Sequence, residues 1–267
     1  MTKNSDDRME NELVFIGTAQ AATGLVFEIP TGVMADTISR KWSILAAHFL
    51  MGAGMAITGL VTEFPALLAT QMLWGLAWTF SSGADVAWLT DEMQAPARTA
   101  GVLTASARWE QVGSAAGIVG FGVLAWATSL AVAIVVAGLA MLALGVFVAL
   151  RFPERHFTPA RTRRWREAAS IFQRGIALAR RDREILLVFA ATVLVNGASD
   201  AFERLYAKRL VELGLPQAPD PIVWLTALGL VTLVIAALVL SLLAMSRDIE
   251  AAARAEPKDD SVSTRSL

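Results

Sequence analysis

Long apolar segments, separated by short polar ones, dominate the pattern along this chain. Seven of them are long enough for a transmembrane helix, which needs about 20 residues to cross about 30 Å of hydrocarbon. They are residues 13–34, 43–61, 66–89, 100–124, 128–150, 185–207 and 222–246. None has the strict alternation of a membrane β-strand, so the pattern predicts an all-α integral membrane protein with about seven transmembrane helices.

The polar segments divide the chain into five regions. These are a polar N-terminal segment (1–12), a bundle of five helices (13–150), a basic linker (151–184), two further helices (185–246) and a polar tail (247–267). The linker has apolar residues at helical spacing with arginines between them, which predicts an amphipathic helix on an anionic membrane surface. A basic connection that only joins two bundles is the alternative.

Composition agrees with a membrane location and excludes several kinds of chemistry. The chain is 55% hydrophobic and 18% charged, whereas soluble domains average about 25% charged residues. It has no cysteine and only two histidines, which excludes thiol catalysis and histidine-rich metal sites. No protease motif is present either, so we expect no catalytic residue, no metal, no cofactor and no enzyme activity.

The distribution of lysine and arginine predicts the orientation in the membrane. With residues 1–12 outside, the inner segments carry seventeen basic residues and the outer segments four. The positive-inside rule therefore places the N-terminus outside and the tail in the cytoplasm, in a multi-pass plasma-membrane protein. Orientation explains the arginines, so no nucleic-acid partner is expected beside the lipid bilayer. Four tryptophans at predicted span ends, Trp42, Trp88, Trp126 and Trp224, are expected to lie at the membrane interface.

The polar turn after the first predicted span carries a distinctive set of residues. Gly32 has no side chain and would let a neighbouring helix approach closely. Asp36 comes at the end of that span, where it can pair with a basic residue or cap the next helix. Arg40 and Lys41 follow and can bind carboxylates or lipid phosphates.

This turn resembles the signature of the major facilitator superfamily between its helices 2 and 3, Gly-x-Leu-Ala-Asp-x-x-Gly-Arg-Lys/Arg-x-x-Leu. The resemblance implies that Gly32, Asp36, Arg40 and Lys41 form a cytoplasmic latch, a contact that holds the two halves of the transporter in one conformation. Ser39 replaces the second glycine of the signature, which predicts a different conformation of the turn.

Other segments resemble bacterial drug-efflux-like members of the same family. Residues 28–32, 73–84 and 88–92 are similar to helices 2 and 4, and residues 200–205 to the start of helix 7. The resemblance implies secondary transport, in the efflux direction, of an unidentified small molecule by alternating access. It also predicts a shortened chain that covers about helices 2 to 8 of twelve, with transport competence left open. The alternative is a non-transporting membrane protein that assembles with another membrane chain.

Ionisable residues within predicted spans are candidates for a substrate or proton site, because charges at membrane depth are costly. They are Glu28, Asp85, Arg108, Glu110, Asp200, Glu203 and Arg204. Asp85 is one candidate partner for Arg108, and static ion pairs between helices are the alternative to function. Proton coupling stays open, because Gln71 stands where the proton-linked antiporters have an arginine.

Three tryptophans are candidates for lining a cavity. Trp74 and Trp78 are one helical turn apart, and Trp109 follows Arg108. Aromatic rings that face a cavity would suit an amphiphilic or cationic substrate through cation–π contacts. Aromatic packing between helices, or contact with lipid, is the alternative.

Overall fold

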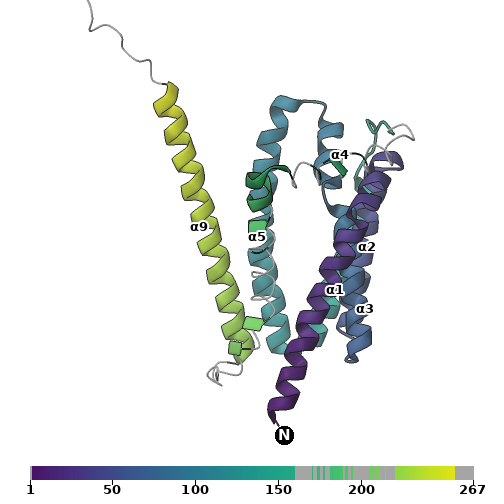
Figure 1. Ribbon diagram of the computed structural model, residues 1–267. Coiled ribbons are helices and arrows are strands. Elements are labelled where there is room, and N and C mark those ends of the chain that lie inside the picture. Colours follow the sequence, from purple (N-terminus) through teal and green to yellow (C-terminus); the bar gives the residue numbers. More distant parts are fainter. Residues whose placement is uncertain are drawn as a thin grey trace, which may run out of the picture.

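The computed structural model describes residues 2–159 and 220–255 and scattered positions between 170 and 214 (Figure 1). Every regular element in this part of the chain is a helix, which confirms the predicted all-α fold class. The helices are α1 (Thr2–Thr37), α2 (Arg40–Thr58), α3 (Phe64–Ser81), α4 (Ala84–Met93), α5 (Pro96–Ala127), α6 (Leu130–Arg151) and α9 (Pro221–Ala255).

Three of the described helices are long and apolar enough to cross a membrane, judged by length and composition. They are Asn11–Thr37, Leu130–Arg151 and Pro221–Leu238, which coincide with three of the predicted spans. The predicted span 185–207 and the predicted linker helix within 151–184 lie for the most part outside the described residues.

The prediction of one continuous helix over 66–89 is wrong. The chain forms α3 and α4 there, separated by Ser82 and Gly83. Gly83 has a φ of 74°, in the left-handed region that glycine adopts without a steric penalty. The break puts Asp85 in the first turn of a separate short helix, which lies at the same end of the bundle as the turn between α1 and α2 (Figure 1).

Small residues allow the helices to pack closely. α2 packs against both α3 and α6, α1 packs against α3, and α9 stands beside α5. Glycines recur seven residues apart on two facing elements, at Gly52 of α2 and Gly59, its C-cap, and at Gly138 and Gly145 of α6. A Cβ atom on Gly138 would lie 2.7 Å from the carbonyl oxygen of Gly52, so these backbones touch as in other small-residue interfaces of membrane helices.

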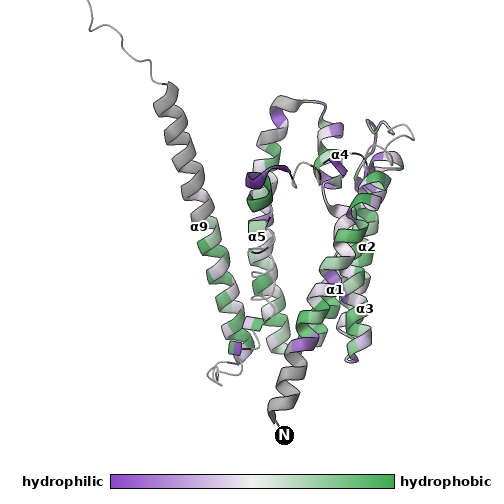
Figure 2. Ribbon diagram, viewed as in Figure 1, coloured by the Kyte–Doolittle hydropathy of each residue, from purple (hydrophilic) through white to green (hydrophobic). Residues whose placement is uncertain are grey.

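Several of the buried side chains are small, and many large apolar side chains are exposed. Ala47, Ala77 and Ala133 are buried, whereas Leu150 on α6 is 78% exposed. Figure 2 shows apolar residues along α2 and α3 and hydrophilic residues around α4. An apolar exterior of this extent suits contact with lipid and is unfavourable in water.

Candidate functional site

The turn between α1 and α2 is built by a serine cap. Ser39 has an extended backbone, with φ −176° and ψ 132°, and its hydroxyl oxygen accepts a hydrogen bond from the backbone N–H of Trp42 at 2.9 Å. An extended residue needs no glycine, and serine is among the best N-cap residues. The residue that departs from the signature therefore starts α2 and leaves Arg40 in its first turn.

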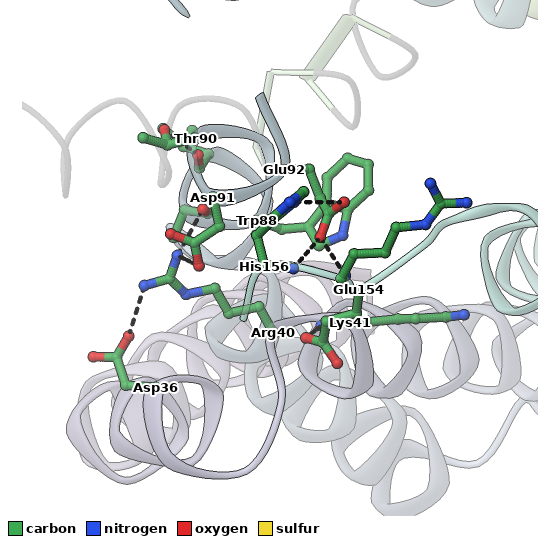
Figure 3. A network of polar contacts seen from close by, with 12 residues as sticks. Asp36, Arg40, Lys41, Trp88, Thr90, Asp91, Glu92, Glu154 and His156 are labelled. Carbon is green, nitrogen blue, oxygen red and sulfur yellow. Dashed lines mark hydrogen bonds and ion pairs between the residues drawn. The ribbon is translucent and has the colours of Figure 1, made fainter. Parts of the chain in front are cut away.

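Arg40 is the centre of a charged cluster at this end of the bundle (Figure 3). Its guanidinium forms an ion pair with Asp91 of α4 and donates a hydrogen bond from Nη1 to the carbonyl oxygen of Ala87 at 2.6 Å. Its Nη2 lies 3.6 Å from a carboxylate oxygen of Asp36, one turn earlier on α1. The Arg40 side chain is only 19% exposed. We call Asp36, Arg40 and Asp91 the Arg40 cluster.

The segment that follows α6 binds the start of α2. In this post-α6 segment (residues 152–157), the carboxylate of Glu154 accepts a hydrogen bond from the Ser39 hydroxyl at 2.6 Å and one from the backbone N–H of Lys41 at 2.9 Å. Lys41 in turn donates from Nζ to the carbonyl oxygen of Ala149 at 2.8 Å. A carboxylate at a helix N-terminus is favourable because free N–H groups and the helix dipole converge there.

The same segment also binds α4. Glu92 accepts hydrogen bonds from the backbone N–H groups of Arg155 at 2.6 Å and His156 at 3.1 Å. The indole N–H of Trp88 donates to the carbonyl oxygen of Pro153 at 2.8 Å, and the indole stacks on Phe152 with ring centroids 4.5 Å apart. Trp88 was expected at the membrane interface; its contacts join α4 to the chain after α6.

The environment of Glu92 shifts its titration. Burial by itself raises the pKa of a carboxyl group, and the Glu92 side chain is only 13% exposed. The backbone hydrogen bonds from His156 and Arg155, together with the charge of His156, outweigh burial and hold the pKa of Glu92 below its usual value.

We therefore expect Glu92 to contribute to stability in a pH-dependent way. A lowered pKa in the folded state means that this contribution is present above the unfolded pKa, near 4.5, and is lost as the pH falls through the folded value. Thermal unfolding of the wild-type chain and Glu92→Gln, between pH 7 and pH 3, measures it. The difference in melting temperature between the wild-type chain and Glu92→Gln should become smaller as the pH falls. A difference that stays constant between pH 7 and pH 3 would contradict the expectation.

Residues far apart in the sequence thus meet at one end of the bundle. Arg40 and Asp91 are 51 positions apart, and Ser39 and Glu154 are 115 apart. The motif predicted Asp36, Arg40 and Lys41, but it gave no signal for Asp91, Glu92 or Glu154. Each of these three is an ordinary charged residue near the end of a predicted span. They could have been suggested only by a search for charges of opposite sign at the ends of different spans.

Gly32 does not have the predicted close contact. A Cβ atom there would meet nothing within 4 Å in the described part of the chain. The close approach of α1 to a neighbour occurs earlier along the helix, where a Cβ atom on Gly75 of α3 would overlap the carbonyl oxygen of Gln20. That approach is possible because Gly75 carries no side chain.

A second candidate site is a pocket of about 380 Å³ between α1 and α3. Its lining includes Gln20, Gly24, Glu28, Trp74, Gly75 and Trp78. The indole rings of the two tryptophans are stacked, with centroids 6.1 Å apart. Glu28, at one end of the lining, accepts a hydrogen bond from the hydroxyl of Ser82 at 2.7 Å.

The structure does not bring the other candidates to this pocket. Trp109 is 73% exposed on α5, where Arg108 and Glu110 are exposed as well. Asp85 accepts a hydrogen bond from the backbone N–H of Val86, and the candidate ion pair between Asp85 and Arg108, both of which the structure describes, is not formed. Asp200, Glu203 and Arg204 lie outside the described residues.

These features define a class of protein. The described helices form an apolar, closely packed bundle. At one end of it, polar contacts join the α1–α2 turn and α4, which precede α5 in the sequence, to the post-α6 segment, which follows α5. Among the described residues, no group of three or more histidine, aspartate or glutamate side chains is arranged to hold a metal ion. This is the architecture of a helical membrane protein with a polar contact at the ends of its helices.

Comparison with protein families identifies the family. The profile of the Major Facilitator Superfamily matches residues 10–252. The chain therefore belongs to the Major Facilitator Superfamily, whose members are membrane transporters that act on small molecules. No curated protein and no solved structure matches the chain.

Proposed function

We propose that this chain is a secondary transporter that exports a small molecule across the plasma membrane by alternating access. The observation that carries the proposal is the joining of three segments at one end of the bundle. The Arg40 cluster connects the α1–α2 turn to α4, and the post-α6 segment contacts both. In a fold that works by rocking of helical units, contacts of this kind determine which end of the bundle is closed.

Within this proposal the Arg40 cluster is the part of the cytoplasmic latch that lies inside the five-helix bundle, since Asp36, Arg40 and Asp91 all precede residue 150. Asp36 and Asp91 share one guanidinium, so a movement that separates α1 from α4 must break an ion pair. Lys41 belongs to the latch through its contact with Ala149 at the end of α6. Gly32 is one turn before Asp36, and no described residue comes within 4 Å of a Cβ atom placed there.

The orientation and the direction of transport are part of the proposal. Seventeen basic residues against four support a cytoplasmic location for the α1–α2 turn and the tail, and an outer location for the N-terminus. The efflux direction is supported by the resemblance of residues 28–32 and 73–84 to efflux members of the family. The family match lends no support to a non-transporting assembly partner.

Glu28 is the ionisable residue we favour for the substrate or proton site. It is the only charged residue of α1 between Glu12 and Asp36, and α3 has none. All four candidate side chains that the structure describes are exposed, but Glu28 lines a pocket, whereas Asp85, Arg108 and Glu110 line none of the described cavity. A carboxylate in an apolar helix pair is costly unless it binds a proton or a ligand.

The test is counterflow into proteoliposomes of the purified full chain. Four labelled probes cover an organic cation, an organic anion, an amino acid and a sugar, with empty liposomes as the blank. We expect saturable flux of one class, reduced several-fold by Asp36→Asn because the amide cannot pair with Arg40. Glu63→Gln, an exposed carboxylate outside both sites, should transport normally.

One outcome would contradict the transport proposal, and another would contradict only the latch assignment. The first is the absence of saturable flux of every class, both for the chain alone and for the chain purified with any membrane protein that copurifies. The second is normal flux in Asp36→Asn, which would leave transport in place and remove the latch assignment.

A further inference from the structure

The pocket between α1 and α3 lies in the middle of a membrane span. Gly24, one of its lining residues, is the central position of the apolar span Asn11–Thr37. Glu28 follows four residues later, about 6 Å further along the helix axis. Substrate sites of secondary transporters lie near the bilayer midplane, and this pocket, which is open on one side with Glu28 and Trp78 exposed, lies at that depth along the span.

The shape of the pocket depends on helices that nearly touch. The α1 and α3 backbones meet where Gly75 faces the carbonyl oxygen of Gln20, and Gly24 lies 3.9 Å from the carbonyl oxygen of Gly75, measured to a built Cβ. Next to this contact, Trp74 and Trp78 extend from α3 in stacked orientation. The volume of about 380 Å³ falls at the lower end of the range for small-molecule pockets, about 300–1,000 Å³.

The electrostatics of the pocket select for positive charge. Among the lining residues that the structure describes, Glu28 is the only ionisable one, and none of them carries a basic side chain. The faces of aromatic rings carry negative potential and attract organic cations, most strongly for tryptophan. A carboxylate and two indoles around one apolar space therefore offer a complement to a cation with an apolar body.

We propose that this pocket binds a compact organic cation, such as a quaternary ammonium group with one aromatic substituent. The two indoles would contact the apolar body and the methyl groups, and Glu28 would balance the charge. The physiological meaning of this inference rests on the proposed transport function, because it names the substrate class. Binding itself is measured at equilibrium and does not require transport.

The experiment uses the purified full chain and tritiated phenyltrimethylammonium, with protein-free micelles as the blank. The uncharged competitor is tert-butylbenzene, which has the same shape with carbon in place of the charged nitrogen. We expect saturable, one-to-one binding of the cation, displaced by unlabelled cation and only at much higher concentration by the neutral molecule. No saturable binding, or equal displacement by both molecules, would overturn the proposal without any variant.

Variants then assign the binding to the pocket. Glu28→Gln keeps an oxygen acceptor for Ser82 and removes the charge, so affinity should fall by about tenfold or more. Trp78→Leu should weaken binding by about threefold to thirtyfold, and Trp78→Phe by less, because a ring remains. Glu63→Gln and Trp109→Leu change exposed residues outside the pocket and should bind normally. Unchanged affinity in Glu28→Gln would overturn the assignment.

The outcome is separable from that of the transport test. Asp36→Asn, which affects the latch, should bind the cation as the wild-type chain does. Transport of another class without cation binding would overturn this inference and leave the proposed function in place. Cation binding without transport of any class would overturn the proposed function and leave this inference in place.

Discussion

Replacing Arg40 with glutamine is expected to lower the free energy of unfolding by about 2 to 4 kcal/mol, the largest effect of any single change at the charged end of the bundle. Arg40 contacts three partners from two helices: Asp36, Asp91 and the carbonyl oxygen of Ala87. Glutamine keeps one donor group and loses the charge, so two carboxylates are left close together and partly buried without their shared cation.

The physical reason for a large effect is the position of the side chain. Surface ion pairs contribute little, because water and salt screen them. Arg40 is 19% exposed and Asp91 29% exposed, and Phe157 lies beside the guanidinium with its ring centroid 6.0 Å from Cζ. Screening is therefore incomplete, and the loss of one member leaves the others desolvated without compensation.

The measurement is thermal unfolding in detergent or unfolding by titration with sodium dodecyl sulphate. Arg151→Gln is the matched control, because it removes the same charge from the exposed last residue of α6. Arg40→Lys should be intermediate, since an ammonium keeps the charge and loses the planar fork of donors. Equal destabilisation by Arg40→Gln and Arg151→Gln would show that the Arg40 cluster contributes no more to the free energy of unfolding than an isolated surface charge does.

The second large effect is expected at Gly75 on α3. Gly75→Ala adds a methyl group where the carbonyl oxygen of Gln20 already lies. A backbone oxygen cannot rotate away as a side chain can, so α1 and α3 must separate along their length. We expect a loss of about 1 to 3 kcal/mol, the usual cost of overpacking a close interface, although alanine is the better helix former.

Gly32→Ala is the matched control, because it is the same substitution on α1, and no atom of the described residues lies within 4 Å of the new methyl group. It should be neutral, or stabilising by up to about 1 kcal/mol through helix propensity. Both variants are compared in the same unfolding assay. Similar stabilities of Gly75→Ala and Gly32→Ala would mean that α1 and α3 do not approach as closely as the structure has them.

The comparison of these two glycines illustrates where sequence reasoning reached its limit. Gly32 stands in a recognisable motif, and a motif glycine suggests close packing. Gly75 stands in an apolar segment among many small residues. Which of them touches a neighbouring backbone depends on the rotation of each helix about its axis. The periodicity of one segment does not specify which helix packs against its small-residue face.

The hydropathy pattern likewise could not place Asp85. Apolar residues continue from 66 to 89, so the hydropathy pattern favours one long helix. The signal against it is local, a serine pair followed by Gly83, and such a glycine either sits within a helix or ends it. The structure ends α3 there, because Gly83 takes a positive φ. Asp85 then lies in the first turn of α4 and does not meet Arg108.

The sequence by itself determined the class of protein. Long apolar segments, few charges and an asymmetric distribution of arginine predict helices in a membrane, because a backbone in lipid must satisfy its own hydrogen bonds. The motif at 32–44 predicted the family and the importance of Asp36, Arg40 and Lys41. These are properties of local sequence, since span length, charge distribution and turn chemistry are each contained within about twenty residues.

Only the tertiary structure decided which residues act together. The partnership of Arg40 with Asp91, of Ser39 with Glu154, and of Glu28 with Trp74 and Trp78 depends on how helices far apart in the sequence are rotated and how closely their glycines let them approach. Small residues at the contacts set those distances, and charges at the helix ends pair where packing has already placed them. The helices follow from local sequence, whereas the Arg40 cluster and the pocket follow from how the helices pack.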